Sequence, residues 1–104
     1  MRVAKICLHD EPAGLLKEIE YRKKYVFEYF PNYDGAVISV TMPKGKVYEF
    51  DKFPAFFEGL LPEGENLEEL MRTLKIDRRD YFGQLIAIGQ DTVGAATISK
   101  VEDE

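Results

Sequence analysis

Alternating apolar and polar residues predict that the first half of the chain is built from β-strands. Side chains that repeat every second residue lie on one face of a strand, and β-branched and aromatic residues favour strands. Five segments have these features, at residues 3–8, 15–21, 25–29, 36–41 and 46–50. Clusters of turn-forming residues separate several of them, at residues 9–14, 30–35 and 42–45. The second and third segments predict an antiparallel hairpin around the basic turn Arg22-Lys23-Lys24.

The stretch from Phe53 to Gly64 predicts a short helix followed by a tight turn. Its large apolar residues fall on one side of a helix: Phe56, Phe57, Leu60 and Leu61. Pro54 suits the first helical position, because its φ is already helical and that position needs no backbone donor. Pro62 cannot extend the helix, and it disfavours helical geometry in the residue before it. Glu63 and Gly64 are therefore predicted to lie in a surface turn that the apolar residues support.

Two further helices are predicted in the second half of the chain. The first has an apolar stripe at positions i, i+3, i+4 and i+7: Leu67, Leu70, Met71 and Leu74. Asn66 is predicted to cap it, with Glu69 three residues on, and Asp77 with Asp80 repeats this arrangement. The second helix carries the apolar residues Tyr81, Phe82, Leu85, Ile86 and Ile88. Gly89 suits its C-terminal end.

The order of these elements predicts an α+β fold. A last strand is predicted at residues 93–101, before the acidic tail Glu102-Asp103-Glu104. Strands and helices do not alternate along the chain, so a doubly wound parallel sheet is not expected. We expect a single domain over residues 1–104. Its antiparallel, barrel-like sheet would have five or six strands, with two or three helices inserted before the last strand.

Composition and charge narrow the classes of function. The chain has 104 residues, of which 45% are hydrophobic and 12% aromatic, as in a folded globular domain. Its formal net charge of -5 argues against direct nucleic-acid binding, which relies on clustered Lys and Arg. No stretch approaches the ~20 apolar residues of a membrane span, and no signal peptide is recognised. We therefore expect a cytoplasmic protein that binds neither nucleic acid nor membrane.

The sequence predicts no catalytic, metal-binding or cofactor-binding site. Cys7 is the only cysteine and His9 the only histidine. Two residues apart on a strand, they would project from the same face, but no third group to orient them is evident. Cys7 is interpreted instead as a packing residue and His9 as a solvent-exposed one. The alternative is a small hydrolase or metal-dependent enzyme built on these two residues and nearby carboxylates.

Three motifs follow one another in a characteristic order. Residues 56–64 read Phe-Phe-Glu-Gly-Leu-Leu-Pro-Glu-Gly, and residues 80–95 combine an Asp-Tyr-Phe helix with a Gly-Gln-Asp-Thr-Val-Gly-Ala turn. Residues 38–43, Ile-Ser-Val-Thr-Met-Pro, match more loosely a serine-containing strand that ends in proline. In this order and spacing, the chain from about residue 8 to residue 98 resembles the N-terminal subdomain of the HipA-type bacterial Ser/Thr kinases, which are toxins of toxin–antitoxin systems.

This resemblance implies a regulatory module without catalytic activity. In the full-length kinases a catalytic domain follows this subdomain, and no catalytic residue of that domain can be transferred to the motifs present here. A free-standing version resembles HipS, the antitoxin of three-part HipBST systems, in which HipT is a truncated kinase and HipB the DNA-binding component. The resemblance therefore implies binding and inhibition of a HipT-like or HipA-like kinase, within a complex that can include a HipB-like protein. The alternative is a subunit that completes or stabilises a split kinase without inhibiting it.

The predicted partner-binding residues lie between the first two helices: Pro62, Glu63, Gly64, Glu65 and Asn66. Helix ends on both sides would fix their direction and reduce the entropy lost on binding. A stable interface covers about 800 Å² on each partner, so other residues must contribute. The candidates are the second helix and the aromatic side chains of Tyr25, Phe27 and Tyr29, although these aromatic residues could instead fill the core.

Overall fold

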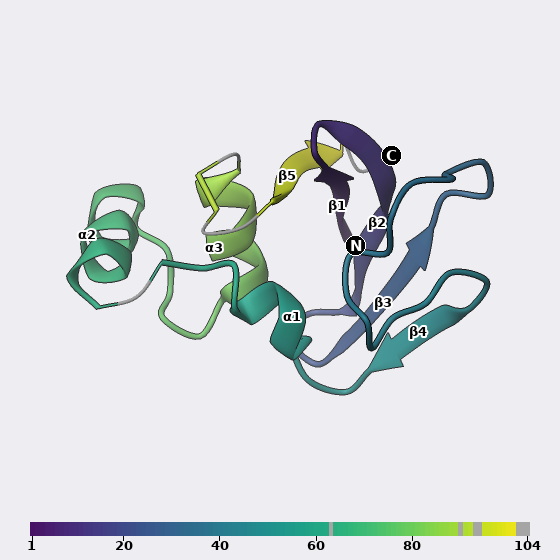
Figure 1. The fold of residues 1–104 in the computed structure, drawn as a ribbon. Helices are drawn as coiled ribbons and strands as arrows, with labels where there is room; N and C mark the ends of the chain where they lie inside the picture. Colours follow the sequence, from purple (N-terminus) through teal and green to yellow (C-terminus); the bar gives the residue numbers. More distant parts are fainter. Residues whose placement is uncertain (63, 90, 93–94, 102–104) are drawn as a thin grey trace.

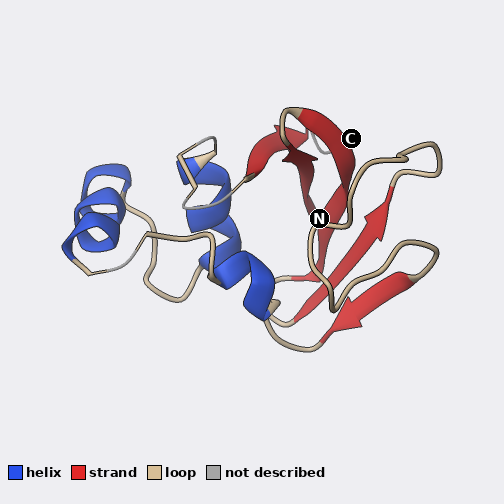
Figure 2. Cartoon of the chain, in the orientation of Figure 1, coloured by secondary structure: helices blue, strands red, loops and turns tan. Residues whose placement is uncertain are grey.

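The computed structural model describes residues 1–62, 64–89, 91–92 and 95–101. In this part of the chain, five antiparallel strands form one sheet in the order β4-β3-β2-β1-β5, and three helices lie between β4 and β5 in sequence (Figures 1 and 2). The elements are β1 (Arg2–Leu8), β2 (Glu11–Glu20), β3 (Lys24–Tyr29), β4 (Val47–Phe50), α1 (Ala55–Glu58), α2 (Glu65–Leu74), α3 (Tyr81–Ile88) and β5 (Ala96–Val101). The predicted α+β class is confirmed.

The sheet is open and does not close into a barrel. Its two edges are β4 and β5, which pair only with β3 and β1 respectively. Helices α1 and α3 lie along the open side of the curved sheet (Figure 1) and contribute buried side chains to the core there. On this side the core is completed by helices and not by pairing of β4 with β5, so the expected barrel-like closure does not occur.

The turn between β1 and β2 is shorter than predicted. Only His9 and Asp10 lie between the two strands, with φ angles of 51° and 66°. Two consecutive residues in the left-handed region are what a tight two-residue hairpin requires. The turn predicted at residues 9–14 is therefore wrong beyond Asp10, because residues 11–14 are already paired in the sheet.

The strand predicted at residues 36–41 does not form. This segment belongs to the connection between β3 and β4 and pairs with no strand. The Tyr29 hydroxyl accepts a hydrogen bond from the backbone N of Ile38 at 3.0 Å and donates one to the carbonyl of Met42 at 2.5 Å. Ile38 and Met42 are buried, whereas Val40 is 91% exposed. Ile38 and Met42 thus reach the core from a loop whose backbone is held by the Tyr29 side chain, and the strand prediction is wrong for this reason.

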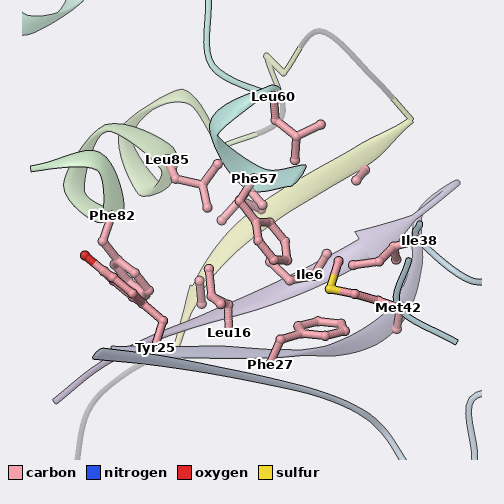
Figure 3. Close-up of a cluster of buried hydrophobic side chains, with 14 of the residues drawn as sticks. Ile6, Leu16, Tyr25, Phe27, Ile38, Met42, Phe57, Leu60, Phe82 and Leu85 are labelled. Carbon is pink, nitrogen blue, oxygen red and sulfur yellow. The ribbon is translucent and has the colours of Figure 1, made fainter. Parts of the chain in front are cut away.

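One face of the sheet packs against the helices (Figure 3). The largest fully buried apolar side chains come from both layers: Ile6, Leu16, Phe27, Phe57, Phe82 and Leu85. The ring centroids of Phe27 and Phe57 lie 5.6 Å apart, which joins β3 to α1. Burial of a large apolar side chain stabilises a fold by about 1.5–3 kcal/mol. This layer therefore fixes the position of α1 and α3 on the sheet.

The last helix and strand lie close to their predicted positions. α3 contains the predicted apolar residues, and Gly89, with φ of 54°, is its C-cap as expected. β5 begins at Ala96, later than the predicted start of the strand at residue 93. Residues 93–94 and the acidic tail at 102–104 lie outside the described residues.

Helix α2 lies apart from the sheet (Figure 1). Among its residues only Met71 is buried, while Leu67 and Leu70 are half-buried and Leu74 is 48% exposed. The predicted apolar stripe is therefore present in the expected register. Other parts of the chain bury only a portion of this stripe, so α2 remains largely accessible to solvent.

Candidate functional site

The connection between α1 and α2 is anchored by buried apolar residues. Phe57, Leu60 and Leu61 are 0%, 6% and 5% exposed, and Pro62 directly after them is half-buried. Helix α1 begins at Ala55. Pro54 has ψ of 134°, so it is the N-cap and not the predicted first helical residue. The predicted support of the connection by apolar residues is confirmed.

The predicted partner-binding residues do not all belong to a turn. Gly64 is the N-cap of α2, while Glu65 and Asn66 are the first two residues of the helix and are exposed. Gly64 has φ of 62° and ψ of -134°, a conformation that favours glycine. The prediction that Asn66 caps α2 is wrong, because the glycine backbone begins the helix two residues earlier. Glu63 lies outside the described residues.

A hollow of about 260 Å³ lies beside this connection. Its lining combines residues of the connection with side chains of all three helices: Glu58, Leu61, Pro62, Gly64, Leu67 and Tyr81. Tyr81 was predicted as one of the apolar residues of α3, yet it is 37% exposed. An exposed aromatic residue beside a hollow is typical of binding surfaces. Periodicity alone could not separate Tyr81 from the buried residues of the same helix.

An ion cluster fixes the start of α3 on the sheet. The Arg2 guanidinium makes two hydrogen bonds to Glu18, at 2.7 and 2.8 Å, and two to Asp80, at 2.7 and 3.0 Å. The rings of Tyr21 and Phe82 lie 5.0 and 5.1 Å from the guanidinium carbon. The Glu18 side chain is only 2% exposed, so Arg2 supplies its compensating charge. The cluster leaves no local pattern in the sequence, because Arg2 and Asp80 are 78 residues apart in the chain.

Asp80 also caps α3. Its carboxylate accepts a hydrogen bond from the backbone N of Gly83 at 3.1 Å. A Cβ at Gly83 would lie 2.3 Å from a carboxylate oxygen of Asp80, so a larger residue there would displace the capping carboxylate. The cap predicted at Asp77 is wrong, since that carboxylate instead accepts from the backbone N of Arg79 in the preceding turn.

Hydrogen bonds favour the charged forms of Arg2 and Asp80. Burial alone would raise the pKa of Asp80, but hydrogen bonds from Arg2 and Gly83 outweigh it and hold the pKa below its ordinary value. Burial alone would lower the pKa of Arg2, whereas hydrogen bonds to Glu18 and Asp80 raise it above its ordinary value. Arg2 and Asp80 are therefore both charged at neutral pH.

A buried amide attaches α2 to α3. Gln84 is fully buried, and its Nε2 donates to the carbonyls of Asp77 and Arg78 at 3.1 and 3.0 Å and lies 3.4 Å from the sulfur of Met71. Its Oε1 has no hydrogen-bond partner in the part of the chain that the structure describes. Gln84 thus holds the connection between the two helices, but with one buried acceptor unsatisfied.

The alternative site at Cys7 and His9 is not assembled as the sequence suggested. Cys7 is half-buried in β1, while His9 is exposed in the hairpin turn with a left-handed φ of 51°. His9 therefore does not continue the strand, and the same-face geometry expected for the pair is lost. Among the described residues, no group of three or more His, Cys, Asp and Glu side chains could hold a metal ion.

The aromatic residues of β3 belong to the core. Tyr25, Phe27 and Tyr29 are 3%, 0% and 8% exposed, which confirms the interpretation that they fill the core. Their side chains therefore add little exposed area to a contact surface. In the same described part of the chain, no helix has the length and apolar character required to cross a membrane.

Comparison with known proteins places the chain in a family. The profile of the HipA N-terminal domain family matches residues 4–99. A protein of uncharacterised function from Haemophilus influenzae is 30% identical over 101 residues, which are 96% of this chain and 93% of the relative. A solved structure of the N-terminal domain of HipA toxin matches with a TM-score of 0.78 and 28% sequence identity, over 100% of this chain and 96% of that one. The similarity is thus to an N-terminal part of HipA and not to its catalytic kinase part, and the chain belongs to the HipA N-terminal domain family.

Proposed function

We propose that this protein is a non-catalytic antitoxin that binds a separately encoded HipA-like or HipT-like Ser/Thr kinase in the cytoplasm and inhibits it. The observation that carries this proposal is the match to the HipA N-terminal domain along nearly the whole chain, by sequence and by fold. A domain that resembles one part of a kinase has a surface suited to packing against the rest of it. A HipB-like DNA-binding protein is a further candidate component of the complex.

The first turn of α2 supports a role in binding. Glu65 and Asn66 are exposed, and they follow a connection held by buried Leu60 and Leu61. A surface whose direction is already fixed loses little conformational entropy when it docks. We therefore keep Pro62, Glu63, Gly64, Glu65 and Asn66 as the proposed partner-binding residues.

Kinase activity with and without this protein tests the proposal. The HipA-type kinase encoded in the same genome would be purified alone and mixed with the full chain, and autophosphorylation would be measured together with binding by calorimetry. We expect a stable complex in which autophosphorylation is suppressed. Increased activity in the complex would instead support the alternative of a complementing subunit. No binding would contradict both.

Matched substitutions test the proposed contact residues. Replacing Glu65 and Asn66 by alanine should weaken kinase binding by about tenfold, the loss expected when contacts worth about 1.4 kcal/mol are removed. The control replaces Glu11 and Asn32 by alanine, an exposed glutamate and an exposed asparagine on segments away from α2 (Figure 1). Equal affinity of the two double variants would exclude the first turn of α2 from the interface.

A further inference from the structure

A groove runs across the surface on both sides of Tyr81. The hollow of about 260 Å³ beside the α1–α2 connection adjoins a larger one of about 400 Å³, and the linings of both include Glu58 and Tyr81. We call the two hollows together the Tyr81 groove. One end is lined by Leu61, Pro62 and Leu67, and the other lies between the β2–β3 turn and the start of α3. The groove thus begins at the proposed partner-binding residues and extends away from them.

The larger hollow is locally cationic although the chain is acidic. Arg22, Lys52 and Arg79 line it, against the two carboxylates of Asp51 and Glu58. Lys52 and Arg79 are exposed, and neither side chain takes part in an ion pair or hydrogen bond with the described residues. In a chain of net charge -5, two uncompensated cations at one hollow favour an anionic ligand group.

A tyrosine with a largely buried ring lines this hollow. Tyr25 lines it and is only 3% exposed, yet its hydroxyl has no hydrogen-bond partner in the described part of the chain. Its ring stacks on that of Phe82, with centroids 6.4 Å apart (Figure 3). Burial, together with the nearby charge of Glu18, raises the pKa of Tyr25, so the hydroxyl stays protonated at neutral pH and can donate to a ligand oxygen. Among the described residues, Gln84 Oε1 is the buried side-chain atom that lacks a partner, so the Tyr25 hydroxyl reaches solvent and is open to a ligand oxygen.

The smaller hollow has an apolar wall, in contrast to the cationic larger one. Leu61 and Pro62 form its apolar wall, and Leu67 of α2 is half-buried beside them. A free anion would use the cationic hollow alone and would gain nothing from this apolar end. A polypeptide segment that carries a carboxylate and a large apolar side chain would use both hollows at once. The continuity of the groove with the proposed contact residues favours such a segment of the same partner.

We infer that the Tyr81 groove is a second docking surface for the partner kinase and that it receives a segment with an acidic side chain next to a large apolar one. The carboxylate would meet Arg22, Lys52 and Arg79, and the apolar side chain would lie against Leu61 and Leu67. This inference rests on the proposed function. It also supplies contact area that the α1–α2 connection cannot provide alone, since a stable interface covers about 800 Å² on each partner.

Charge reversal tests the cationic end. The variant Lys52→Glu/Arg79→Glu should bind the kinase at least about tenfold more weakly, and the salt dependence of its association should decrease, because steering by opposite charges is lost. The control Lys46→Glu/Lys100→Glu makes the same change in net charge at two exposed lysines outside the groove and should bind like the unmodified chain. Equal affinity of the groove variant and the control would overturn the inference.

Two leucines of the same helix test the apolar end. Leu67→Ala should weaken kinase binding several-fold, and Leu67→Met should restore most of the affinity because it keeps the apolar volume. Leu74→Ala removes a leucine of α2 that does not line the groove and should leave the affinity unchanged. Thermal unfolding of each variant shows whether it is folded. If Leu67→Ala unfolds, the charge variants, whose side chains are exposed, still decide the question.

Two further results separate this inference from the proposed function. If the unmodified chain binds and inhibits the kinase while all groove variants bind equally well, the inference is wrong and the proposed function stands. If the unmodified chain does not bind the kinase, both fail. Inorganic phosphate titrated into the chain is the probe for a free anion. Saturable phosphate binding that Arg79→Glu abolishes without any change in kinase affinity would identify an anion site and overturn the docking surface.

Discussion

Helix α3 is held in contrasting ways on its two sides. Towards the sheet, Arg2 joins β1, β2 and the start of α3 through four charge-assisted hydrogen bonds, and its guanidinium lies beside the buried ring of Phe82. Towards α2, the attachment consists of the Gln84 amide, a few apolar contacts and an ion pair between Arg78 and Glu68 that is exposed on both sides. The Tyr81 groove lies where the strongly held part meets the weakly held part.

This difference indicates how the binding surface is organised. The cationic end of the groove is carried by the sheet, the connection after β4 and the turn before α3, which the Arg2 cluster positions. The apolar end includes Leu67 of α2, a helix with a single buried residue. A partner would therefore meet a preorganised cationic end and a more adaptable apolar one.

Removal of Arg2 should have the largest effect. Arg2→Ala leaves the Glu18 carboxylate, which is 2% exposed, without its compensating charge. Loss of one partner from a buried ion pair destabilises a protein by about 3 kcal/mol or more. We expect the free energy of unfolding, measured by urea denaturation, to fall by that amount. Arg79→Ala, which removes an exposed arginine without an ion pair among the described residues, should change it by less than about 0.5 kcal/mol. Similar losses in both variants would contradict a structural role for the cluster.

Gln84→Leu should destabilise the attachment of α2 by about 2 kcal/mol. The carbonyls of Asp77 and Arg78 would lose their donor, at a cost of about 1–3 kcal/mol, although the unsatisfied Oε1 is also removed. Amide hydrogen exchange measures where this loss falls. We expect faster exchange in α2 and unchanged exchange in β1 and β2, because the contacts of Gln84 lie between α2 and α3. Uniform acceleration across the sheet would show that the two parts unfold together.

Local pattern predicted those elements whose side chains repeat with a regular period. The helical stripe from Leu67 to Leu74 and the hairpin at residues 15–29 are present because each needs only its own amphipathic face. The segment at residues 36–41 has the same β-branched composition, but the hydroxyl of Tyr29 binds its backbone and no strand lies beside it. Such a contact between separate elements leaves no periodic signal in the sequence.

The positions of the proposed partner-binding residues could also be predicted only in part. Pro62 and Gly64 were correctly placed between two helices, because proline and glycine restrict the backbone locally. Glu65 and Asn66 were assigned to the turn since the N-cap role of Gly64 depends on its φ and ψ, which the sequence does not specify. The groove could not be predicted at all. The groove forms only when Arg22, Lys52 and Arg79, from three separate segments, line one hollow. The start of α3 is held beside them by the bond between Arg2 and Asp80, which are 78 residues apart in the sequence.

Acidification should weaken the sheet side of α3 by a smaller amount than loss of Arg2. The pKa of Asp80 is lower in the folded chain than its ordinary value of about 3.9, so the unfolded chain binds the proton more readily. The contribution of Asp80 is therefore complete above that ordinary value and is lost as the pH falls through the folded-state pKa. The difference in stability between the unmodified chain and Asp80→Asn isolates this contribution, because the asparagine cannot titrate but keeps an N-cap side chain. We expect the unmodified chain to lose more stability than this variant between about pH 5 and pH 3.

The exposed ion pair of α2 should contribute least. Arg78 and Glu68 have side chains that are 73% and 46% exposed, and such pairs contribute about 0–1 kcal/mol because water and salt screen them. Arg78→Ala should therefore lower the free energy of unfolding by less than about 1 kcal/mol, and about 1 M salt should remove most of the difference from the unmodified chain. The same salt should leave the much larger effect of Arg2→Ala nearly unchanged, since the Glu18 carboxylate is shielded from solvent. A loss from Arg78→Ala as large as that from Arg2→Ala would mean that α2 is held as firmly as the sheet, and that the apolar end of the groove is no more adaptable than the cationic end.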